Sequence, residues 1–244
     1  GFSLGASDLP GNLTLQYPTL YAHANASLAL ATDKTLTLGN SATSTFAGLI
    51  GGVTSLAKQG AGTLILTGNN TYSGSTLISG GALQVGDGGS AGTLGQGAIT
   101  IQSGELVFSR AGAFTLANAI SGAGSVRQLG SGTVILTGQS TYTGLTHLPD
   151  AGAAVFRHDT VPTTQGFTGT GTVLVEPASE RFTNPVYSQY DFASTLQGFT
   201  LGKVGMAQTV PLASPVQIAG QINLYASSLT LTEPIQSTST VSLV

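Results

Sequence analysis

A segment of this chain occurs twice, and the two copies lie 70 residues apart. The first copy begins at Gly60 and reads GAGTLILTGNNTYSG, and the second begins at Gly130 and reads GSGTVILTGQSTYTG. In both copies, alternating apolar residues and threonines lead into a turn rich in small polar residues. Short strand patterns that recur at a fixed period are typical of a solenoid, in which each repeat packs on its neighbours. The repeat therefore predicts a stack of β-strand coils.

The composition argues against a helical protein. Charged residues make up 7% of the chain, whereas about 25% is usual. Glycine occurs 35 times, and helices tolerate glycine poorly and need long charged side chains on their exposed face. At 41% hydrophobic residues, the chain still has enough apolar material to offset the loss of chain entropy on folding. We therefore expect an ordered all-β fold.

Strand-like alternation also occurs outside the two copies. Examples are NLTLQY from Asn12, KTLTLG from Lys34 and ELVFSR from Glu105, in which every second residue would be buried. Short strands at this spacing also suit a sandwich or a barrel. Those folds do not normally repeat in sequence, so the repeat favours the solenoid. With roughly 20 to 25 residues in a coil, one unit would make about three coils stacked about 4.8 Å apart.

The repeat contains residues whose expected role is structural. They are Leu64, Leu66, Tyr72, Val134, Leu136 and Tyr142. The leucines and the valine alternate with threonine and should fill the interior of the solenoid. The two tyrosines are expected to stack at a corner of the coil rather than to bind a ligand. We expect Gly68, Gly74, Gly138 and Gly144 to supply turn conformations that other residues do not adopt.

These strings resemble a known family of repeats. GTLILTGNNTYSGSTLISGGALQVGDGG and GTVILTGQSTYTG are similar to the passenger-associated β-strand repeat of bacterial autotransporter proteins. The resemblance covers roughly residues 46–156, and the tail from Gln217 to Val244 more loosely resembles the haemagglutinin-type repeats of large secreted adhesins. It implies a right-handed parallel β-helix in a passenger region that is displayed at the cell surface or released. The repeat itself is scaffold, so the resemblance identifies no catalytic residue.

Residues 149–200 depart from the repeat pattern. This stretch holds seven of the sixteen Phe and Tyr residues, together with five acids and two bases, so it carries the whole net charge of −3. Aromatic side chains among polar groups, where a regular scaffold is interrupted, are typical of a binding surface. We therefore expect a β-helix at 1–148, a non-repeat insert or small subdomain at 149–200, and C-terminal β-helix coils at 201–244. Alternatively, the aromatic residues of 149–200 form a small core of their own.

Three classes of function stay open. In the first, the chain is an adhesin segment whose insert binds a glycan, a matrix component or a host surface. The residues expected to make that contact are Glu180, Arg181, Tyr187, Tyr190, Asp191 and Phe192. In the second, the chain is a filament or sheath subunit that associates with itself through unpaired strand edges of its end coils, as in a biofilm. In the third, it is a polysaccharide-degrading enzyme that uses Asp150, Asp159 or Glu176.

The scarcity of charge favours a non-catalytic role. Catalytic carboxylates need charged neighbours that set their pKa values, and acids outside 149–200 are isolated. A net charge of −3 gives no electrostatic reason to expect nucleic acid or an anionic membrane as a partner. No apolar run reaches the roughly 18 to 20 residues of a membrane span, so we expect no membrane insertion.

We expect no cofactor and no metal ion. The chain contains no cysteine, and His23, His147 and His158 are scattered along the sequence rather than grouped as metal ligands. A β-rich chain without cysteine, rich in Thr, Ser and Gly, suggests a protein that is exported before it folds. We therefore expect it at the bacterial cell surface or outside the cell, after export across the outer membrane.

Overall fold

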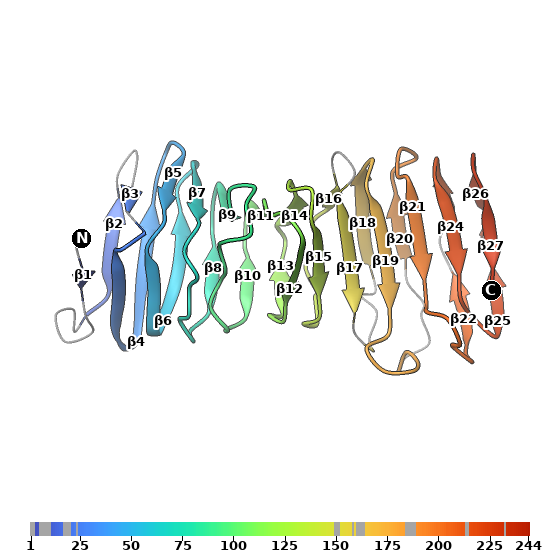
Figure 1. Ribbon diagram of the computed structural model, residues 1–244, viewed down its shortest axis with the longest axis horizontal. Helices are drawn as coiled ribbons and strands as arrows, with labels where there is room; N and C mark the ends of the chain where they lie inside the picture. The colour runs from blue at the N-terminus through green and yellow to red at the C-terminus, as the bar shows by residue number, and fades with distance from the viewer. Residues whose placement is uncertain are drawn as a thin grey trace.

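The chain forms a parallel β-solenoid of about ten turns (Figure 1). The computed structural model describes residues 3–4, 11–16, 21–22, 24–148, 152–157, 159, 164–183, 189–212, 215–231 and 233–244. Every strand pairing among them is parallel, and none of them forms a helix that could cross a membrane. The all-β solenoid expected from the repeat is confirmed.

Three ladders of strands run along the solenoid. The N-terminal sheet contains β1 (Ser3–Leu4), β2 (Leu13–Gln16), β4 (Ser27–Gly39), β6 (Leu49–Gln59), β8 (Thr76–Ile78), β10 (Ile99–Ile101) and β13 (Ile120–Gly122). The central sheet contains β3 (Tyr21–Ala22), β5 (Ser44–Phe46), β7 (Thr63–Leu66), β9 (Ala82–Val85), β11 (Glu105–Phe108), β14 (Ser125–Gln128), β16 (Thr146–Leu148), β18 (Thr164–Gly169) and β20 (Gln189–Phe192).

The C-terminal sheet replaces the N-terminal sheet in the second half of the molecule. It contains β12 (Ala113–Leu116), β15 (Thr133–Leu136), β17 (Ala153–Arg157), β19 (Thr172–Glu176), β21 (Gly198–Leu201), β24 (Gln221–Leu224) and β27 (Val241–Leu243). Two further pairs complete the last coils: β22 (Thr209–Leu212) with β25 (Ser228–Leu231), and β23 (Val216–Ile218) with β26 (Ile235–Ser237).

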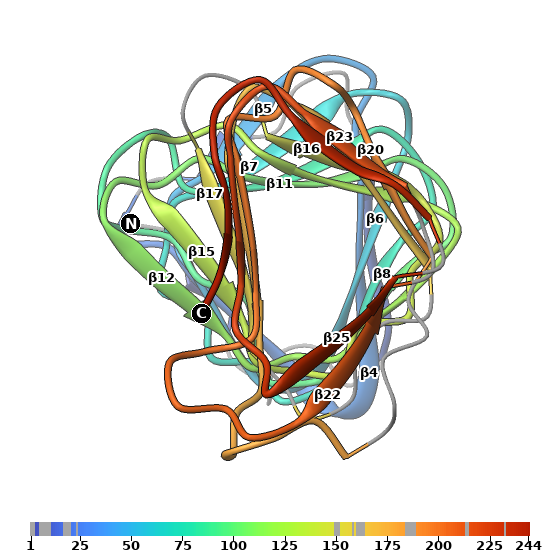
Figure 2. The same cartoon turned by 90° about the vertical axis from the view of Figure 1, so that its right-hand side faces the viewer.

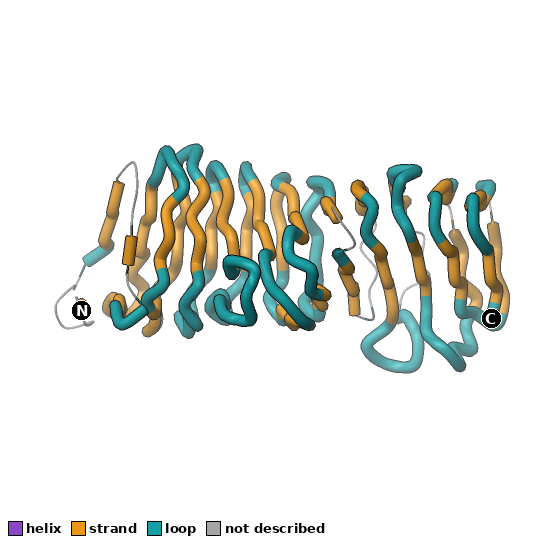
Figure 3. Tube along the Cα trace, turned by 45° about the horizontal axis from the view of Figure 1, so that its top comes forward, coloured by secondary structure: helices purple, strands orange, loops and turns teal. Residues whose placement is uncertain are grey.

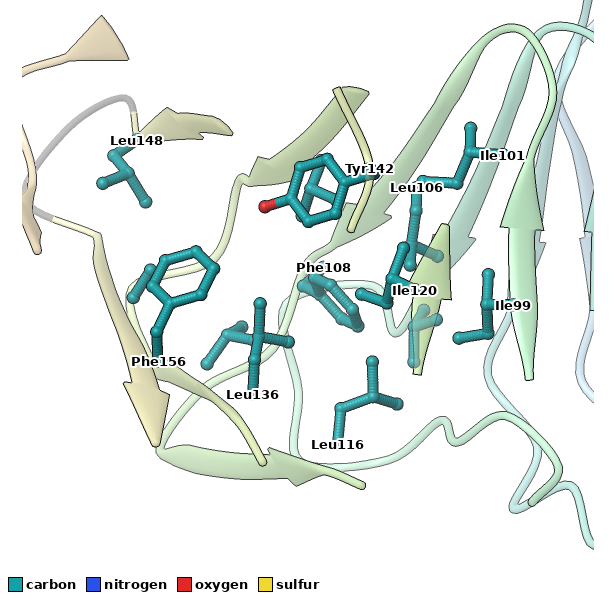
Figure 4. Close-up of a cluster of buried hydrophobic side chains, with 14 of the residues drawn as sticks. Ile99, Ile101, Leu106, Phe108, Leu116, Ile120, Leu136, Tyr142, Leu148 and Phe156 are labelled. Atoms are coloured by element: carbon teal, nitrogen blue, oxygen red, sulfur yellow. The ribbon is translucent and has the colours of Figure 1, made fainter. Parts of the chain in front are cut away.

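The interior is one continuous apolar core. In β7 and β15, every second residue is buried, and Leu64, Leu66, Val134 and Leu136 are each at most 2% exposed. Side chains from successive coils point toward one another inside the solenoid, as Figure 4 shows for Phe108, Leu116, Leu136 and Phe156. The alternation of apolar and polar residues therefore produces the packing that it predicts.

The two copies of the repeat lie on different faces of the solenoid. In the first copy, β7 and β9 belong to the central sheet and β8 to the N-terminal sheet, whereas in the second, β15 and β17 belong to the C-terminal sheet and β16 to the central sheet. Figure 2, viewed along the solenoid axis, shows β7 and β15 on different sides. Thr63, Ala82, Glu105 and Ser125 are successive partners in the central ladder, and Thr133 starts the second copy on the next face. The 70-residue offset between the copies therefore corresponds to three full coils plus one further face of the solenoid.

The repeat glycines have a different role from the one expected. Gly68, Gly74, Gly138 and Gly144 all lack a positive φ, so the prediction of special turn conformations is wrong for them. They lie where successive coils approach closely: a Cβ on Gly68 would overlap the carbonyl oxygen of Gly48 in the preceding coil. Glycine is required there because any side chain would push the two coils apart.

The strands of residues 149–200 continue the ladders of the solenoid. β17, β19 and β21 pair in register in the C-terminal sheet, and β16, β18 and β20 pair in the central sheet. Aromatic rings of this segment contact one another with centroids 4.6 to 5.8 Å apart, in a chain that contains Phe156, Phe167, Tyr190, Phe192 and Phe199. These rings pack in the common core. The described strands of this stretch therefore belong to the coils and not to a separate subdomain.

Candidate functional site

Charged residues are concentrated at one corner of the C-terminal coils. Six of the seventeen charged residues lie there: Arg157, Asp159, Glu176, Glu180, Arg181 and Lys203. The strands that end at this corner are β17, β19 and β21. In a chain with so few charged side chains, this corner is the most polar part of the C-terminal half that the structure describes.

Two successive loops project from this corner, and we call them the corner loops. They are residues 177–183, which follow β19, and residues 202–208, which follow β21. Figures 2 and 3 show them extending beyond the body of the solenoid. Gly202 and Gly205 have φ angles of 85° and 82°, a conformation that favours glycine and lets the second loop turn sharply.

Each corner loop is anchored by one apolar side chain. Phe182 is 1% exposed and Met206 is 5% exposed, and both belong to the common core. The residues on either side of these anchors are exposed, including Arg181, Thr183, Gly205 and Ala207. The loops are therefore fixed from inside while their outer residues face solvent.

Hydrogen bonds tie the two corner loops to each other. The side chain of Gln208 accepts a hydrogen bond from the Phe182 amide at 2.9 Å and donates one to the Phe182 carbonyl at 3.0 Å. The Lys203 ammonium group donates to the carbonyl oxygen of Ser179. These bonds hold the loops side by side without a strand pairing.

Asp159 supports the first corner loop from the preceding coil. Its carboxylate accepts a hydrogen bond from the Ser179 amide at 2.8 Å, and its main-chain carbonyl accepts one from the Thr183 amide at 2.8 Å. The hydrogen bonds from Ser179 lower the pKa of the Asp159 carboxyl group, with a smaller contribution from the charge of Lys203. This direction keeps Asp159 ionised, whereas a general acid needs a raised pKa.

A groove of about 720 Å³ lies between the corner loops. Its lining residues are Ser179, Glu180, Arg181, Lys203, Val204, Gly205 and Ala207. The volume is within the range of small-molecule sites, about 300 to 1,000 Å³. Val204 is 77% exposed and gives the rim an apolar contact surface.

The structure separates the residues that the sequence grouped as a binding surface. Glu180 and Arg181 line the groove, whereas Asp191 is exposed on β20 of the central sheet. Tyr190 is 3% exposed and Phe192 packs against the core, so neither ring is an open stacking face. Tyr187 lies outside the described residues.

The three carboxylates considered for catalysis do not form a described pair. Glu176 is bonded to Arg157, with 2.5 Å between Oε1 and Nε, and Asp159 is bonded to Ser179. Asp150 lies outside the described residues, as do His23 and His158. His147 is described and its Nδ1 lies 2.6 Å from the Thr168 hydroxyl.

Sequence reasoning missed the second corner loop. Lys203 and Val204 lie just beyond position 200, where the boundary of the insert was expected, so the groove combines residues from both sides of that boundary. A signal was present: Lys203 is the only lysine after Lys58, and it follows the last strand-like pattern of the aromatic segment.

The repeat tyrosines lie inside the solenoid. Tyr72 and Tyr142 are at most 1% exposed, and their hydroxyl oxygens lie 2.7 and 2.6 Å from the hydroxyls of Thr76 and Thr146. Burial raises the pKa of both phenols. Both rings are thus parts of the core, out of reach of a ligand at the surface.

Comparison with known proteins assigns the repeat. Residues 56–85 and 126–153 match the family model of the passenger-associated-transport-repeat. The chain carries two passenger-associated-transport repeats. These passenger repeats coincide with the two copies found in the sequence, and they begin four residues before Gly60 and Gly130.

The chain is also similar to part of an adhesin. Over 97 residues, it is 43% identical to the adhesin BmaC autotransporter of Brucella suis biovar 1 (strain 1330). The matched part is 37% of this chain and 3% of the length of that relative. No solved structure matches the chain. The resemblance to bacterial autotransporter passengers is confirmed, and the chain is a distant homologue of an autotransporter adhesin.

Proposed function

We propose that this chain is a segment of an extracellular autotransporter passenger that mediates adhesion without catalysis. The observation that carries the proposal is the pair of passenger repeats in a chain related to an adhesin. In this function, the solenoid is a stiff support at the bacterial surface, and the corner loops contact a glycan, a matrix component or a host surface. Binding groups commonly lie on loops that a rigid scaffold positions.

The construction of the corner supports this function. Coils of a solenoid contact only their neighbours, so a loop can project without disturbing the core. The corner loops are anchored by Phe182 and Met206 and cross-linked through Gln208. Their outer residues are therefore held in place before a partner arrives, which lowers the entropic cost of binding.

The state of the carboxylates supports a non-catalytic role. Glu176 is neutralised by Arg157, and hydrogen bonds lower the pKa of Asp159. A glycosidase that inverts or retains configuration requires one carboxyl group with a raised pKa as its acid. The pKa of Asp159 is shifted in the opposite direction.

An adhesion assay with coated beads tests the proposal. Beads carrying the chain, the variant E180A/R181A or the control variant E105A/R127A are washed over immobilised glycans, matrix proteins and host cells. Each variant removes one acid and one base, but Glu105 and Arg127 form an ion pair on the central sheet, away from the corner loops. We expect the groove variant to lose roughly tenfold in retention, equivalent to about 1.4 kcal/mol, and the control to keep it.

Two outcomes would contradict the proposal. Equal retention of the two variants would place the adhesive surface outside the groove, and no retention on any surface would remove adhesion as the function. Light scattering over a wide concentration range tests the self-association alternative at the same time. A molar mass that rises with concentration, with filaments in electron micrographs, would favour the structural subunit.

A further inference from the structure

The groove between the corner loops holds two charged groups that the described residues leave uncompensated. Glu180 and Arg181 are exposed, and within the described chain neither side chain forms an ion pair or a hydrogen bond. The other charged groups of the corner have partners: Arg157 with Glu176, and Lys203 with the Ser179 carbonyl. The two groups without a partner in the described chain, Glu180 and Arg181, thus both line the groove.

The chemistry of these groups indicates what they would bind. A guanidinium group binds a carboxylate through two parallel hydrogen bonds, and the carboxylate of Glu180 accepts hydrogen bonds from hydroxyl groups. With Lys203 nearby, the groove lining carries two cations and one anion. The exposed Val204 offers an apolar surface to the carbon face of a sugar ring. Hydroxyls, a carboxylate and an apolar face occur together in acidic sugars.

We propose that this groove binds a saccharide that carries a carboxylate, such as a uronic acid residue. Arg181 pairs with the carboxylate, and Glu180 accepts hydrogen bonds from the neighbouring hydroxyls. The inference rests on the proposed adhesive function and names the class of its ligand. A volume of about 720 Å³ suits a short oligosaccharide segment, since drug-sized ligands occupy about 300 to 1,000 Å³.

The strand topology disfavours an extended peptide in this groove. Peptides that bind to β-proteins commonly add a strand to an exposed sheet edge. Here β19 already pairs with β17 and β21, and β21 pairs with β19 and β24. Among the described strands, β19 and β21 therefore offer no free edge to an added strand at the start of the corner loops, and recognition there depends on the side chains of the loops.

Titration calorimetry on the full chain tests the ligand class. The probes are α-1,4-linked trigalacturonic acid, the neutral α-1,4-linked galactotriose and a triglutamate peptide. We expect trigalacturonic acid to bind at least about tenfold more tightly than either of the others, because only it offers both the carboxylate and the ring hydroxyls. Its affinity should fall as salt is raised, since the pair is exposed.

Substitutions assign the binding to the proposed residues. R181Q should lower the affinity for trigalacturonic acid at least about tenfold, and R181K by less, because it keeps the charge but loses the bidentate geometry. E180Q should weaken binding to a smaller extent than R181Q. The matched control R127Q, on the central sheet, should leave it unchanged. The exposed position of Arg181 predicts unaltered thermal melting of its variants, which circular dichroism checks.

The outcomes separate the ligand class from the function. Equal binding of the acidic and the neutral trisaccharide would overturn the role of the carboxylate, and equal binding of triglutamate would overturn the saccharide. If no probe binds while beads still adhere through Glu180 and Arg181, the ligand class is wrong and the adhesive function stands. If no probe binds and beads do not adhere, both proposals fail.

Discussion

The two passenger repeats have closely similar sequences but occupy different faces of the solenoid. The strand TLIL at 63–66 lies in the central sheet, and its counterpart TVIL at 133–136 lies in the C-terminal sheet. Both copies nevertheless bury the same positions and form the same tyrosine–threonine hydrogen bond. The repeat is therefore a local unit that specifies a strand, a turn and an interior, and it works on whichever face the chain has reached.

The copies differ at two buried polar positions. Lys58 lies near the start of the first passenger repeat. It is fully buried and donates from Nζ to the carbonyls of Gln59, Gly60 and Gly80 at 2.7 to 3.2 Å. Its counterpart Gln128 donates to the carbonyls of Gly130 and Gly132. Both side chains satisfy carbonyls of a glycine turn, but only the lysine carries a charge into the interior.

At the second position, an asparagine is replaced by a serine. Asn70 accepts from the Ile50 amide at 2.8 Å and donates to the carbonyls of Gly68 and Thr93. Ser140, its counterpart, contacts the carbonyl of Gly138 at 3.4 Å. In the first copy, the Asn70 side chain thus links three successive coils. In the second copy, the Ser140 side chain instead makes the weaker contact with Gly138.

The largest expected effect tests what the two copies share. L66D and L136D each place a carboxylate in the interior, where burial of an unpaired charge adds to the loss of packing. We expect each to lower the free energy of unfolding by more than about 4 kcal/mol, measured by denaturant titration. If one copy tolerated the charge, the interior would not be equivalent on the two faces.

The next largest effect tests the hydrogen bonds of Asn70. N70S should cost about 2 to 3 kcal/mol, because the buried amide of Ile50 loses its partner. S140A should cost less than about 1 kcal/mol, because it removes one long hydrogen bond. Thermal melts of the two variants compare the two positions directly. Similar losses of stability would show that Asn70 and Ser140 contribute equally to the stability of the fold.

The buried lysine should make stability depend on pH. Burial lowers the pKa of Lys58 from 10.5 to about 8 in the folded state, so between these values the unfolded chain binds more protons. The free energy of unfolding should therefore rise as pH increases from about 8. In K58Q, which introduces the side chain that the second copy has at Gln128, the rise should be absent. The comparison is made at about pH 7 and about pH 9, where tyrosines with the usual pKa of about 10 are still mostly protonated. Parallel pH profiles for the two proteins would exclude a buried charge.

The smallest expected effect concerns the tyrosine hydroxyls. Y72F and Y142F each remove one hydrogen bond to a threonine, at a cost of about 1 kcal/mol. Because the two bonds have nearly equal lengths, the two costs should agree to within about 0.5 kcal/mol. Double-mutant cycles with T76V and T146V isolate the bond itself, and unequal coupling energies would show that the two faces differ in the interior.

The candidate site shows where sequence reasoning reaches its limit. The concentration of charge and aromatic residues in 149–200 drew attention to Glu180 and Arg181, which line the groove. It also suggested Tyr190 as a contact residue, but Tyr190 alternates with Asp191 on a strand and faces the core. Alternation gives two possible faces, and only the register with neighbouring coils decides which one is buried.

The sequence by itself determined the solenoid, the interior residues of the repeat and the relation to autotransporter passengers. These follow from alternation and recurrence, which are local properties of the chain. Only the tertiary structure decided the face on which each copy lies, the close approach that requires Gly68, and the joining of the corner loops into one groove. Each of these depends on contacts between residues about one coil apart. Such contacts depend on the lengths of all the intervening turns, which no single segment of the sequence specifies.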